Sequence, residues 1–347
     1  MKAIITFFIL FLFSSLSGFS QKENVLFIGN SFTHMHALCR IYENIGNSLG
    51  KDIYADTIAV SGSTIKKHTE RPFTYKKLKK KSWDYVFIQA YSRELSYDSL
   101  TIETETIPYT KLLIDSIKAH NPCAKIYFYM TWGYRDGFID SIPSDTYNLM
   151  QERIIKGYVQ LSKATGGYPI APVGVVWSEM RAAHPTINLY ESDLFHPNIY
   201  GSYIAATTLF SSTHNLSPKG AKHPKKIADS TALIIEEIAF KTTKLNWKTY
   251  NLDTVQLKKI GAKPAFDFVV QQKYLAITVL NKAPKDLPIH WDFGDGSSSD
   301  HYNAKHYYSK PGRYTITLSV KYNCIWYDYT KVVKVAKSNP KKRKQVN

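Results

Sequence analysis

Short apolar runs alternate with longer amphipathic segments over the first two thirds of the chain. Buried β-strands are predicted where β-favouring apolar residues cluster, at 25–28, 52–60, 83–89, 125–132 and 170–176. Apolar residues recur every three to four positions in segments predicted to be helical, at 37–45, 76–81, 106–119, 147–165, 200–210 and 229–241. This alternation predicts a three-layer α/β/α fold, with a parallel sheet between two layers of helices.

The pattern changes beyond residue 264. Apolar and polar residues then alternate with a period of two, in strands predicted at 276–280, 289–293, 314–320 and 330–335, separated by turn-forming clusters. This predicts a small all-β, Ig-like sandwich. The predicted organisation is a signal peptide (1–20), an α/β domain (21–245), a linker (246–262), a β-sandwich (263–337) and a basic tail (338–347).

The N-terminus predicts export. Met1-Lys2 precedes a short apolar run and then small residues, which is the pattern of a secretory signal peptide cut near Ser20 and Gln21. An uncleaved membrane anchor is the alternative, although the run is short for a full span. No later segment is apolar for long enough to cross a bilayer, so we expect a secreted, periplasmic or cell-surface protein without stable membrane insertion.

The 347-residue chain carries 45 Lys and Arg against 28 Asp and Glu, a formal net charge of +17. The lysines are spread over the sequence, so nucleic-acid binding is not predicted, and attraction to anionic surface polymers is favoured instead. The three cysteines leave at least one unpaired and have no metal-site spacing.

Ser31 is a candidate nucleophile. It follows the predicted strand 25–28 through Gly29-Asn30, and an apolar pattern typical of a helix comes after it. A serine at such a junction projects from the sheet edge, and its backbone N–H lies at the positive end of the helix, where an oxyanion is stabilised. Helix capping by Asn30 and Ser31 is the alternative.

Asp193 and His196 are candidate partners for that serine. They are three residues apart, and Pro197 and a predicted helix follow, so both can project from one loop. Asp193 would accept a hydrogen bond from one imidazole nitrogen, while the other nitrogen takes the proton of Ser31. The alternative is that Asp193 caps a helix and His196 is an incidental loop residue.

Gly62 and Gln89 follow the second and third predicted strands. In parallel sheets the carboxyl ends of the strands lie at one edge, where function gathers. A backbone N–H at Gly62 and the amide of Gln89 would there be available as hydrogen-bond donors to an oxyanion. A plain loop glycine and an ordinary hydrogen-bonding glutamine are the alternatives.

These motifs resemble those of a known superfamily. Ile28-Gly29-Asn30-Ser31-Phe32 resembles the first block of the SGNH (GDSL-like) hydrolases, and Asp193-Leu194-Phe195-His196-Pro197 resembles their last block. The resemblance covers residues 24 to 240 and implies a flavodoxin-like fold. It also implies that Ser31 is the nucleophile, with Asp193 and His196 completing a triad. The N–H groups of Ser31 and Gly62 would then hold the oxyanion.

The third block departs from the superfamily. Its usual Gly-x-Asn-Asp is replaced by Gln89-Ala90-Tyr91-Ser92-Arg93, so the asparagine donor is missing. The chain looks like a divergent branch with glutamine at this point. The resemblance therefore carries the oxyanion-donor role to Gln89, with Arg93 as the alternative.

The C-terminal region is similar to a PKD domain. Trp291-Asp292-Phe293-Gly294-Asp295-Gly296 and the later segment 311–318 carry the resemblance. We interpret Asp292 and Asp295 as turn-forming residues rather than metal ligands. Such modules imply spacing, or contact with polysaccharide or protein. The aromatic residues that would make this contact are Tyr302, Tyr307, Trp326 and Tyr327.

The prediction is a secreted serine esterase that cleaves an oxygen ester through an acyl-enzyme, with acylated polysaccharide or another small ester as substrate and no metal or organic cofactor. Tyr91, Trp132 and Trp177 follow predicted strands or end them, and are candidates to line a sugar pocket. The absence of a long apolar lid segment disfavours a lipase. The alternatives are a non-catalytic polysaccharide-binding protein that keeps the fold, and an O-acyltransferase.

Overall fold

The computed structural model describes residues 22–255 and 263–337. These fall into two units, one ending at Asp253 and one beginning at Thr254. The predicted signal peptide, part of the predicted linker and the basic tail lie outside the described residues. Among the helices of the described ranges, none has the length and apolar character needed to cross a membrane.

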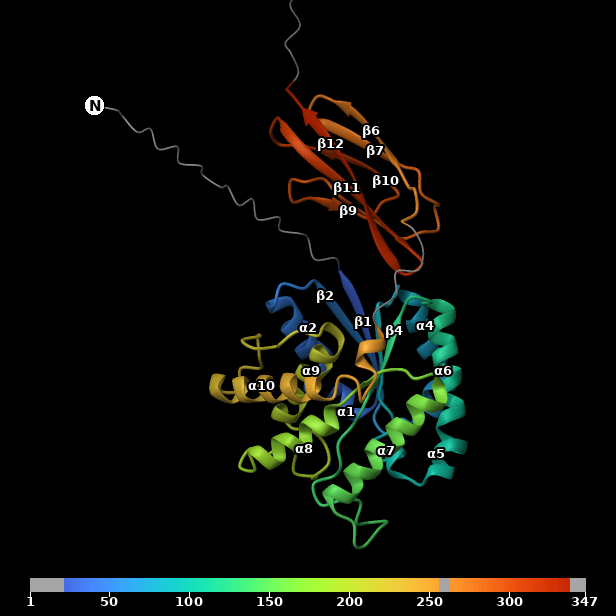
Figure 1. Cartoon of the computed structure of the whole chain (residues 1–347), viewed down its shortest axis with the longest axis vertical. Coiled ribbons are helices and arrows are strands. Elements are labelled where there is room, and N and C mark those ends of the chain that lie inside the picture. The colour runs from blue at the N-terminus through green and yellow to red at the C-terminus, as the bar shows by residue number, and fades with distance from the viewer. Residues whose placement is uncertain (1–21, 256–262, 338–347) are drawn as a thin grey trace, which may run out of the picture. The chain divides into compact units, whose positions relative to one another are not determined.

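The first unit is built on a five-stranded parallel sheet in the order β2-β1-β3-β4-β5 (Figure 1). The strands are β1 (Glu23–Gly29), β2 (Ile53–Ala59), β3 (Tyr85–Ile88), β4 (Lys125–Tyr129) and β5 (Ile170–Ala171). Val25 of β1 is opposite Ala55 of β2 on one side and Tyr85 of β3 on the other. The chain thus leaves β1 in one direction and returns on its other side. In such sheets ligands bind at this switch point, outside the carboxyl ends of β1 and β3.

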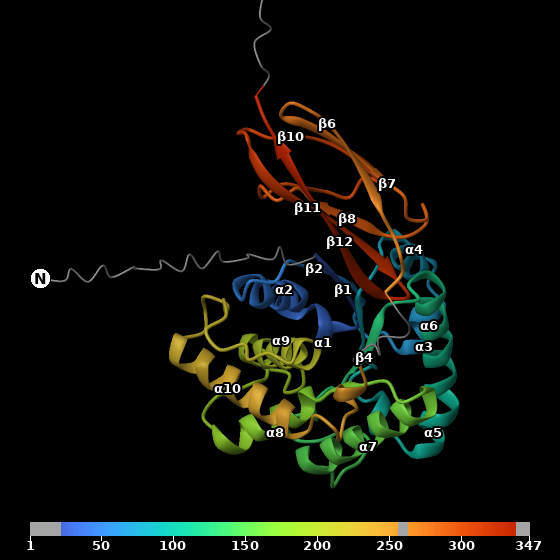
Figure 2. The same cartoon turned by 45° about the horizontal axis from the view of Figure 1, so that its top comes forward.

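Helices cover both faces of the sheet, which confirms the predicted three-layer fold (Figures 1 and 2). One layer holds α2 (Leu38–Ser48), α8 (Val173–Ala183), α9 (Ile199–His214) and α10 (Asp229–Leu245). The other holds α3 (Ile65–Thr69), α4 (Pro72–Lys80), α5 (Ser99–Glu105), α6 (Ile107–His120) and α7 (Tyr147–Thr165). Short helical turns are α1 (Ser31–His34), η1 (Met35–Ala37), η2 (Glu94–Ser96) and η3 (Leu252–Val255).

Helix α9 is buried on nearly all sides although it is rich in serine and threonine. It packs against α2, α8 and α10, and every residue from 201 to 212 is buried. Several of its hydroxyls donate to carbonyls one turn earlier, for example Thr208 Oγ1 to the Ile204 oxygen at 2.7 Å. Because these donors are satisfied within the helix, their burial carries little penalty. Ser202 Oγ and Ser211 Oγ are buried without a hydrogen-bond partner among the described residues.

The predicted fifth strand over 170–176 is wrong in its second half. Only Ile170 and Ala171 pair with β4, and α8 begins at Val173, directly after Pro172. Proline favours the first turn of a helix, and the buried residues Val173, Val176, Trp177 and Met180 recur with helical spacing. The valines at 173, 175 and 176 favour a strand when only these few residues are considered, so the helical period was not recognised.

The first unit also extends past residue 245, the predicted end of the α/β domain, to Asp253. Tyr250 and Leu252 are buried, and the Tyr250 carbonyl accepts the N–H of Ile170 at 2.9 Å. The segment after α10 therefore completes the hydrogen bonding at the start of β5.

The second unit contains two antiparallel sheets, in the orders β10-β7-β6 and β12-β11-β8-β9. The strands are β6 (Phe268–Lys273), β7 (Ala276–Asn281), β8 (Ile289–Asp292), β9 (Ser298–Ser299), β10 (Asn303–Tyr307), β11 (Gly312–Tyr322) and β12 (Ile325–Val335). Its core gathers around the buried Trp291, whose ring meets that of Phe268 edge-on at 5.1 Å. The predicted all-β fold is confirmed, although β6, β9 and β10 were not predicted.

Asp292 and Asp295 have the turn-forming contacts that we expected. An Asp292 oxygen accepts the N–H of Gly294 at 2.7 Å, and an Asp295 oxygen accepts the N–H of Ser297 at 3.1 Å. Gly294 has a φ of +75°, which suits a residue without Cβ. Of the four candidate contact aromatics, Tyr307 is widely exposed, Tyr302 and Trp326 are half-buried, and Tyr327 is buried.

Candidate active site

The turn after β1 places Ser31 at the start of α1. Asn30 is the N-cap, and its Oδ1 accepts the N–H of Phe32 at 3.0 Å. Ser31 is half-buried, directly outside the carboxyl end of a strand whose apolar residues are fully buried. A Cβ on Gly29 would collide with the side chains of Thr33 and Gln89. Glycine is therefore required at this position, because these two side chains pack directly against its Cα.

A second loop, between α8 and α9, supplies the acid-base residues. An isolated antiparallel bridge joins Tyr190 to Pro197. The residues between them form a short loop, which is closed by the Glu191 N–H donating to the His196 carbonyl at 2.9 Å. Asp193 Oδ1 accepts the backbone N–H groups of Phe195 and His196, at 3.1 and 2.9 Å. These bonds fix the direction of the Asp193 side chain.

Ser31, His196 and Asp193 form one continuous chain of hydrogen bonds. His196 Nδ1 lies 2.6 Å from Asp193 Oδ2, and His196 Nε2 lies 2.7 Å from Ser31 Oγ. Since a carboxylate only accepts, the imidazole proton belongs on Nδ1 and Nε2 accepts from the Ser31 hydroxyl. Ser31 and His196, 165 positions apart in the sequence, thus meet in the geometry that a nucleophile and its general base require.

The loop keeps Asp193 charged. Desolvation raises the pKa of this carboxyl, but hydrogen bonds from the His196 ring and from the N–H groups of His196 and Phe195 outweigh it, so the pKa lies below its usual value. An ionised Asp193 can orient the imidazole and stabilise the imidazolium that forms when Ser31 loses its proton.

Two backbone N–H groups are candidates for the oxyanion hole. Gly62 follows β2 with a φ of +67°, and the space that its Cβ would fill is open. Across residues 22–255, neither the N–H of Ser31 nor that of Gly62 donates to a protein acceptor. Both groups therefore remain available to a ligand, and their role as oxyanion donors stays a prediction.

Gln89 does not point its amide at an open site. It is 1% exposed, and its Oε1 accepts the N–H of Asn30 at 2.9 Å and the hydroxyl of Thr33 at 2.7 Å. Its Nε2 donates to the Ala90 carbonyl. The residue predicted as an oxyanion donor instead braces the nucleophile turn from below, because buried backbone groups of that turn need an acceptor.

Arg93, the alternative donor, is also engaged elsewhere. Its guanidinium lies over the rings of Phe138 and Tyr91, with 4.8 and 5.4 Å to their centroids. Its Nε is buried and has no hydrogen-bond partner among the described residues. No contact joins Arg93 to Ser31 or His196 within the described chain.

Two further buried groups that we did not predict hold the loops around Ser31. His68 is fully buried, and its Nε2 bonds the Gly29 carbonyl at 2.8 Å. Glu94 accepts the N–H of Tyr91 at 2.8 Å and that of Ile65 at 3.4 Å, which ties the loop after β3 to the loop after β2. Neither residue has a sequence signal beyond lying a few positions after a strand end.

Two histidines after the nucleophile connect it to both neighbouring loops. His34 Nε2 lies 2.9 Å from Ser61 Oγ, next to Gly62. His36 Nε2 lies 3.2 Å from both Glu191 Oε1 and the Pro197 carbonyl. His36 adopts a φ of +51°, which is unusual for a residue with a side chain and turns it toward the loop that carries His196.

Stacked aromatic rings lie behind His196. The Phe32 ring meets the imidazole edge-on at 5.5 Å and stacks on Trp132 at 4.5 Å, and Trp132 stacks on Trp177 at 4.0 Å. Both tryptophans are fully buried. The predicted sugar-pocket role for Trp132 and Trp177 is therefore wrong, because they pack the core between α8 and the sheet. Tyr91 is half-buried.

Comparison with known proteins supports the division of the chain. Residues 270–335 match the family model for a PKD domain. The PKD1 domain of Vibrio anguillarum Epp is 24% identical, covering 23% of this chain and 100% of that one, with a TM-score of 0.21. No curated protein matches the sequence.

Two solved structures resemble the first unit. A DUF4886 family protein from Bacteroides uniformis is 18% identical and has a TM-score of 0.56, covering 65% of this chain and 95% of that one. A protein from Slackia heliotrinireducens, classed as a candidate SGNH hydrolase, is 22% identical with a TM-score of 0.44, covering 55% and 98%. The first of these likenesses supports the predicted three-layer α/β fold, and the family-model match supports the predicted PKD domain, whereas membership of the SGNH hydrolases stays a prediction.

Proposed function

We propose that this chain, an SGNH-type fold joined to a PKD domain, is an exported serine esterase that hydrolyses oxygen esters through an acyl-enzyme. The observation that carries the proposal is the hydrogen-bond chain from Asp193 through His196 to Ser31, at 2.6 and 2.7 Å. Side chains from two distant loops meet there in the order that nucleophilic catalysis requires.

The reaction follows from these contacts. Ser31 Oγ attacks the ester carbonyl carbon while its proton moves to His196 Nε2, and Asp193 holds the opposite nitrogen and stabilises the imidazolium. The N–H groups of Ser31 and Gly62 stabilise the negative oxygen of the tetrahedral intermediate. The intermediate collapses as His196 protonates the departing alcohol oxygen, leaving Ser31 acylated.

Deacylation repeats these steps with water. His196 takes a proton from the water as the oxygen attacks the acyl carbon, and then returns the proton to Ser31 Oγ as the acid leaves. These steps require only groups of the protein and water. If a sugar hydroxyl replaced water, the same acyl-enzyme would transfer its acyl group, so product analysis with added sugars distinguishes a hydrolase from an acyltransferase.

The substrate that we propose is an acyl group, such as acetyl, on a polysaccharide. The supporting features are the N-terminal sequence typical of an exported protein, the PKD domain and a net charge of +17, which favours polyanionic surfaces. The PKD domain would act as a spacer, or contact polysaccharide or protein.

The direct test is hydrolysis of p-nitrophenyl acetate by the mature protein and by its Ser31→Ala variant, both checked by circular dichroism. We expect the variant to keep its fold and lose at least ~10³-fold in kcat, because the nucleophile is gone. Equal activity of the two proteins would contradict the assignment of Ser31. Absence of activity in both, on acetylated polysaccharides as well, would favour a non-catalytic binding protein.

A further inference from the structure

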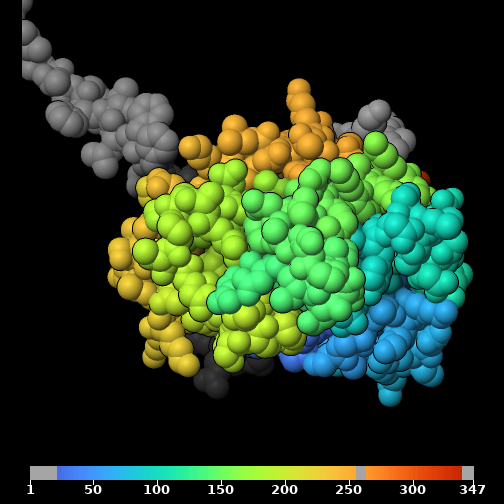
Figure 3. All heavy atoms as spheres, turned by 90° about the horizontal axis from the view of Figure 1, so that it is seen from below, coloured from blue at the N-terminus to red at the C-terminus, as the bar shows by residue number. Residues whose placement is uncertain are grey.

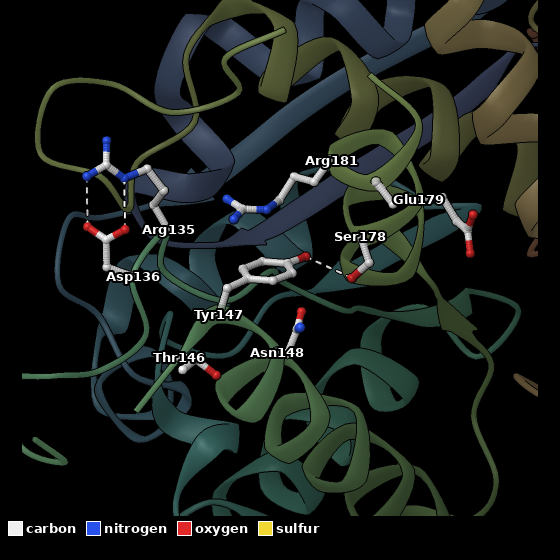
Figure 4. A pocket seen from close by; sticks show the side chains of 9 residues that line it. Arg135, Asp136, Thr146, Tyr147, Asn148, Ser178, Glu179 and Arg181 are labelled. Atoms are coloured by element: carbon white, nitrogen blue, oxygen red, sulfur yellow. Dashed lines mark hydrogen bonds and ion pairs between the residues drawn. The ribbon is translucent and has the colours of Figure 1, made fainter. Parts of the chain in front are cut away.

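A cavity of about 770 Å³ opens beside the active site, in the first unit. It lies between the loop after β4, the first turn of α7 and the last turns of α8 (Figure 4). Figure 3 shows the face of the molecule where the green segment after β4 lies beside the yellow-green residues of α8. Its lining residues are Arg135, Asp136, Thr146, Tyr147, Asn148, Ser178, Glu179, Arg181 and Ala182.

Arg181 supplies a cation without a counter-ion in this cavity. Arg135 is neutralised by Asp136 through two hydrogen bonds, at 3.0 and 2.8 Å. Within the described residues, Arg181 has no carboxylate within ion-pair distance. Glu179, the other acidic lining residue, turns its carboxylate away from Arg181 in Figure 4.

Two tyrosine rings hold the Arg181 guanidinium in place. It lies 4.1 Å from the ring centroid of Tyr147 and 5.4 Å from that of Tyr190. The Tyr147 hydroxyl bonds Ser178 Oγ at 2.8 Å (Figure 4), and Ser178 Oγ donates to the Gly174 carbonyl at 3.0 Å, which fixes the Tyr147 ring. Burial raises the pKa of Tyr147 to about 12, so the ring stays neutral beside Arg181. The Asp136 carboxylate feels the charge of Arg181, but its hydrogen bonds go to Arg135.

The loop that carries Asp193 and His196 also contacts two of the cavity's lining residues. The Arg181 guanidinium lies over the Tyr190 ring, and the bridge between Tyr190 and Pro197 brings Tyr190 next to the residue that follows His196. The N–H of Arg135 donates to the Leu194 carbonyl at 2.8 Å, one residue from Asp193. A polymer bound at Ser31 therefore has the cavity within reach of its neighbouring units.

We propose that Arg181 and its tyrosine platform bind a carboxylate-bearing sugar unit of the polymer whose ester lies at Ser31. A preorganised guanidinium pairs with a planar carboxylate through two parallel hydrogen bonds, and the cavity has the size of a small-ligand site. Asn148 and Thr146 provide polar groups for sugar hydroxyls. This inference rests on the proposed function and narrows its substrate to acylated acidic polysaccharides.

Binding is tested without turnover, in the full mature chain carrying Ser31→Ala. The ligands are tetragalacturonate and an uncharged galactose tetramer, titrated by calorimetry at fixed ionic strength. We expect binding of the acidic tetramer only, and an affinity loss of about tenfold or more when Arg181→Gln is added. Arg181→Lys, which keeps the charge but not the planar fork, should lose part of the affinity.

Lys163→Gln is the matched control for net charge. Lys163 is exposed at the opposite end of α7, so its removal changes the overall field equally without touching the cavity. We expect a change of less than about twofold. Equal losses from Lys163→Gln and Arg181→Gln, equal binding of the neutral tetramer, or no binding of either tetramer would overturn the proposal. Thermal unfolding of each variant identifies a loss that comes from misfolding.

Kinetics separates this inference from the proposed function. On acetylated oligogalacturonate, Arg181→Gln should raise KM about tenfold with kcat little changed, whereas hydrolysis of p-nitrophenyl acetate should not change. Esterase activity that Arg181→Gln lowers alike on acidic and neutral substrates would overturn the inference and leave the function standing. Arg181-dependent binding without any esterase activity would overturn the function and leave the binding site.

Discussion

Two sets of polar groups lie at the same edge of the sheet and are used in opposite ways. The reactive set is Ser31, Asp193 and His196, and the bracing set is Gln89, Glu94 and His68. In the reactive set the side chains of Asp193 and His196 are 38% and 22% exposed, and His196 bonds both Asp193 and Ser31. The bracing set is at most 6% exposed and bonds mainly the backbone of the surrounding loops.

The difference shows which of these polar groups are placed so that they could act on a ligand. Ser31 and His196 satisfy each other where a substrate can displace the contact, whereas Gln89 is already committed to buried groups whose loss would be costly. Both sets are polar and lie near the same edge of the sheet. What separates them is whether the functional atoms face the interior or the opening.

Asp193→Asn should have the largest effect on activity. An amide cannot hold the imidazole in the tautomer that leaves Nε2 as a base, so we expect kcat to fall by about 10³- to 10⁴-fold with little loss of stability. Steady-state hydrolysis of p-nitrophenyl acetate and urea unfolding measure the two quantities. A variant that keeps its activity would show that Asp193 only caps the loop.

An effect of intermediate size concerns His68 and pH. Burial lowers its pKa to about 4, below the ordinary value of about 6.5, so the folded state favours the neutral ring. The contribution of the neutral His68 ring to the free energy of unfolding is complete above pH 6.5 and decreases as the pH falls. Near pH 4 the loss reaches about 3 kcal/mol.

His68→Gln tests this assignment because its amide can still donate to the Gly29 carbonyl but does not titrate. Urea unfolding at pH 7 and pH 4 should show wild type losing about 3 kcal/mol more than the variant. Other titrating groups, including the buried His214, contribute to both proteins and cancel in the difference. Parallel pH curves would mean that His68 is not the buried acid-sensitive group.

The smallest effect distinguishes the two roles considered for Gln89. Gln89→Ala leaves the Asn30 N–H and the Thr33 hydroxyl without their acceptor, so we expect a loss of about 1–3 kcal/mol in unfolding free energy and less than a tenfold change in kcat. An oxyanion donor would give the reverse, a 10²- to 10³-fold loss in kcat at unchanged stability.

Thr33→Val provides a matched control for that experiment. It removes the other partner of the same hydrogen bond, so the stability losses of Gln89→Ala and Thr33→Val should not add in the double variant. Additive losses would contradict the hydrogen bond between the two side chains.

Most of the fold could be predicted because the strands and helices have local sequence patterns that indicate their type and their ends. The buried strand before Ser31 and the nineteen-residue helix ending at Gly166 both have a clear period and clear ends. The start of α8 could not, because a run of valines suits a strand as well as a helix, and only packing against α9 and α10 decides between them.

The candidate site divides in the same way. Asp193-Leu194-Phe195-His196 carries its spacing in the sequence, so the contact between Asp193 and His196 could be predicted, and the resemblance to the SGNH hydrolases joined both to Ser31. The role of Arg181 could not, because its cavity arises from how α7 and α8 pack, and Tyr190, which contacts its guanidinium, comes from another loop. The direction of the Gln89 amide likewise depends on unpaired groups in another segment of the chain.

The central claim is that Ser31 is a nucleophile activated by His196, and covalent labelling tests it most directly. The folded mature protein would be treated with a fluorophosphonate, which phosphonylates activated serines, and the modified peptide identified by mass spectrometry. The account predicts one adduct, on the peptide that contains Ser31, absent in Ser31→Ala and greatly slowed in His196→Asn. An adduct on another serine, or none on Ser31 in a folded protein, would contradict it.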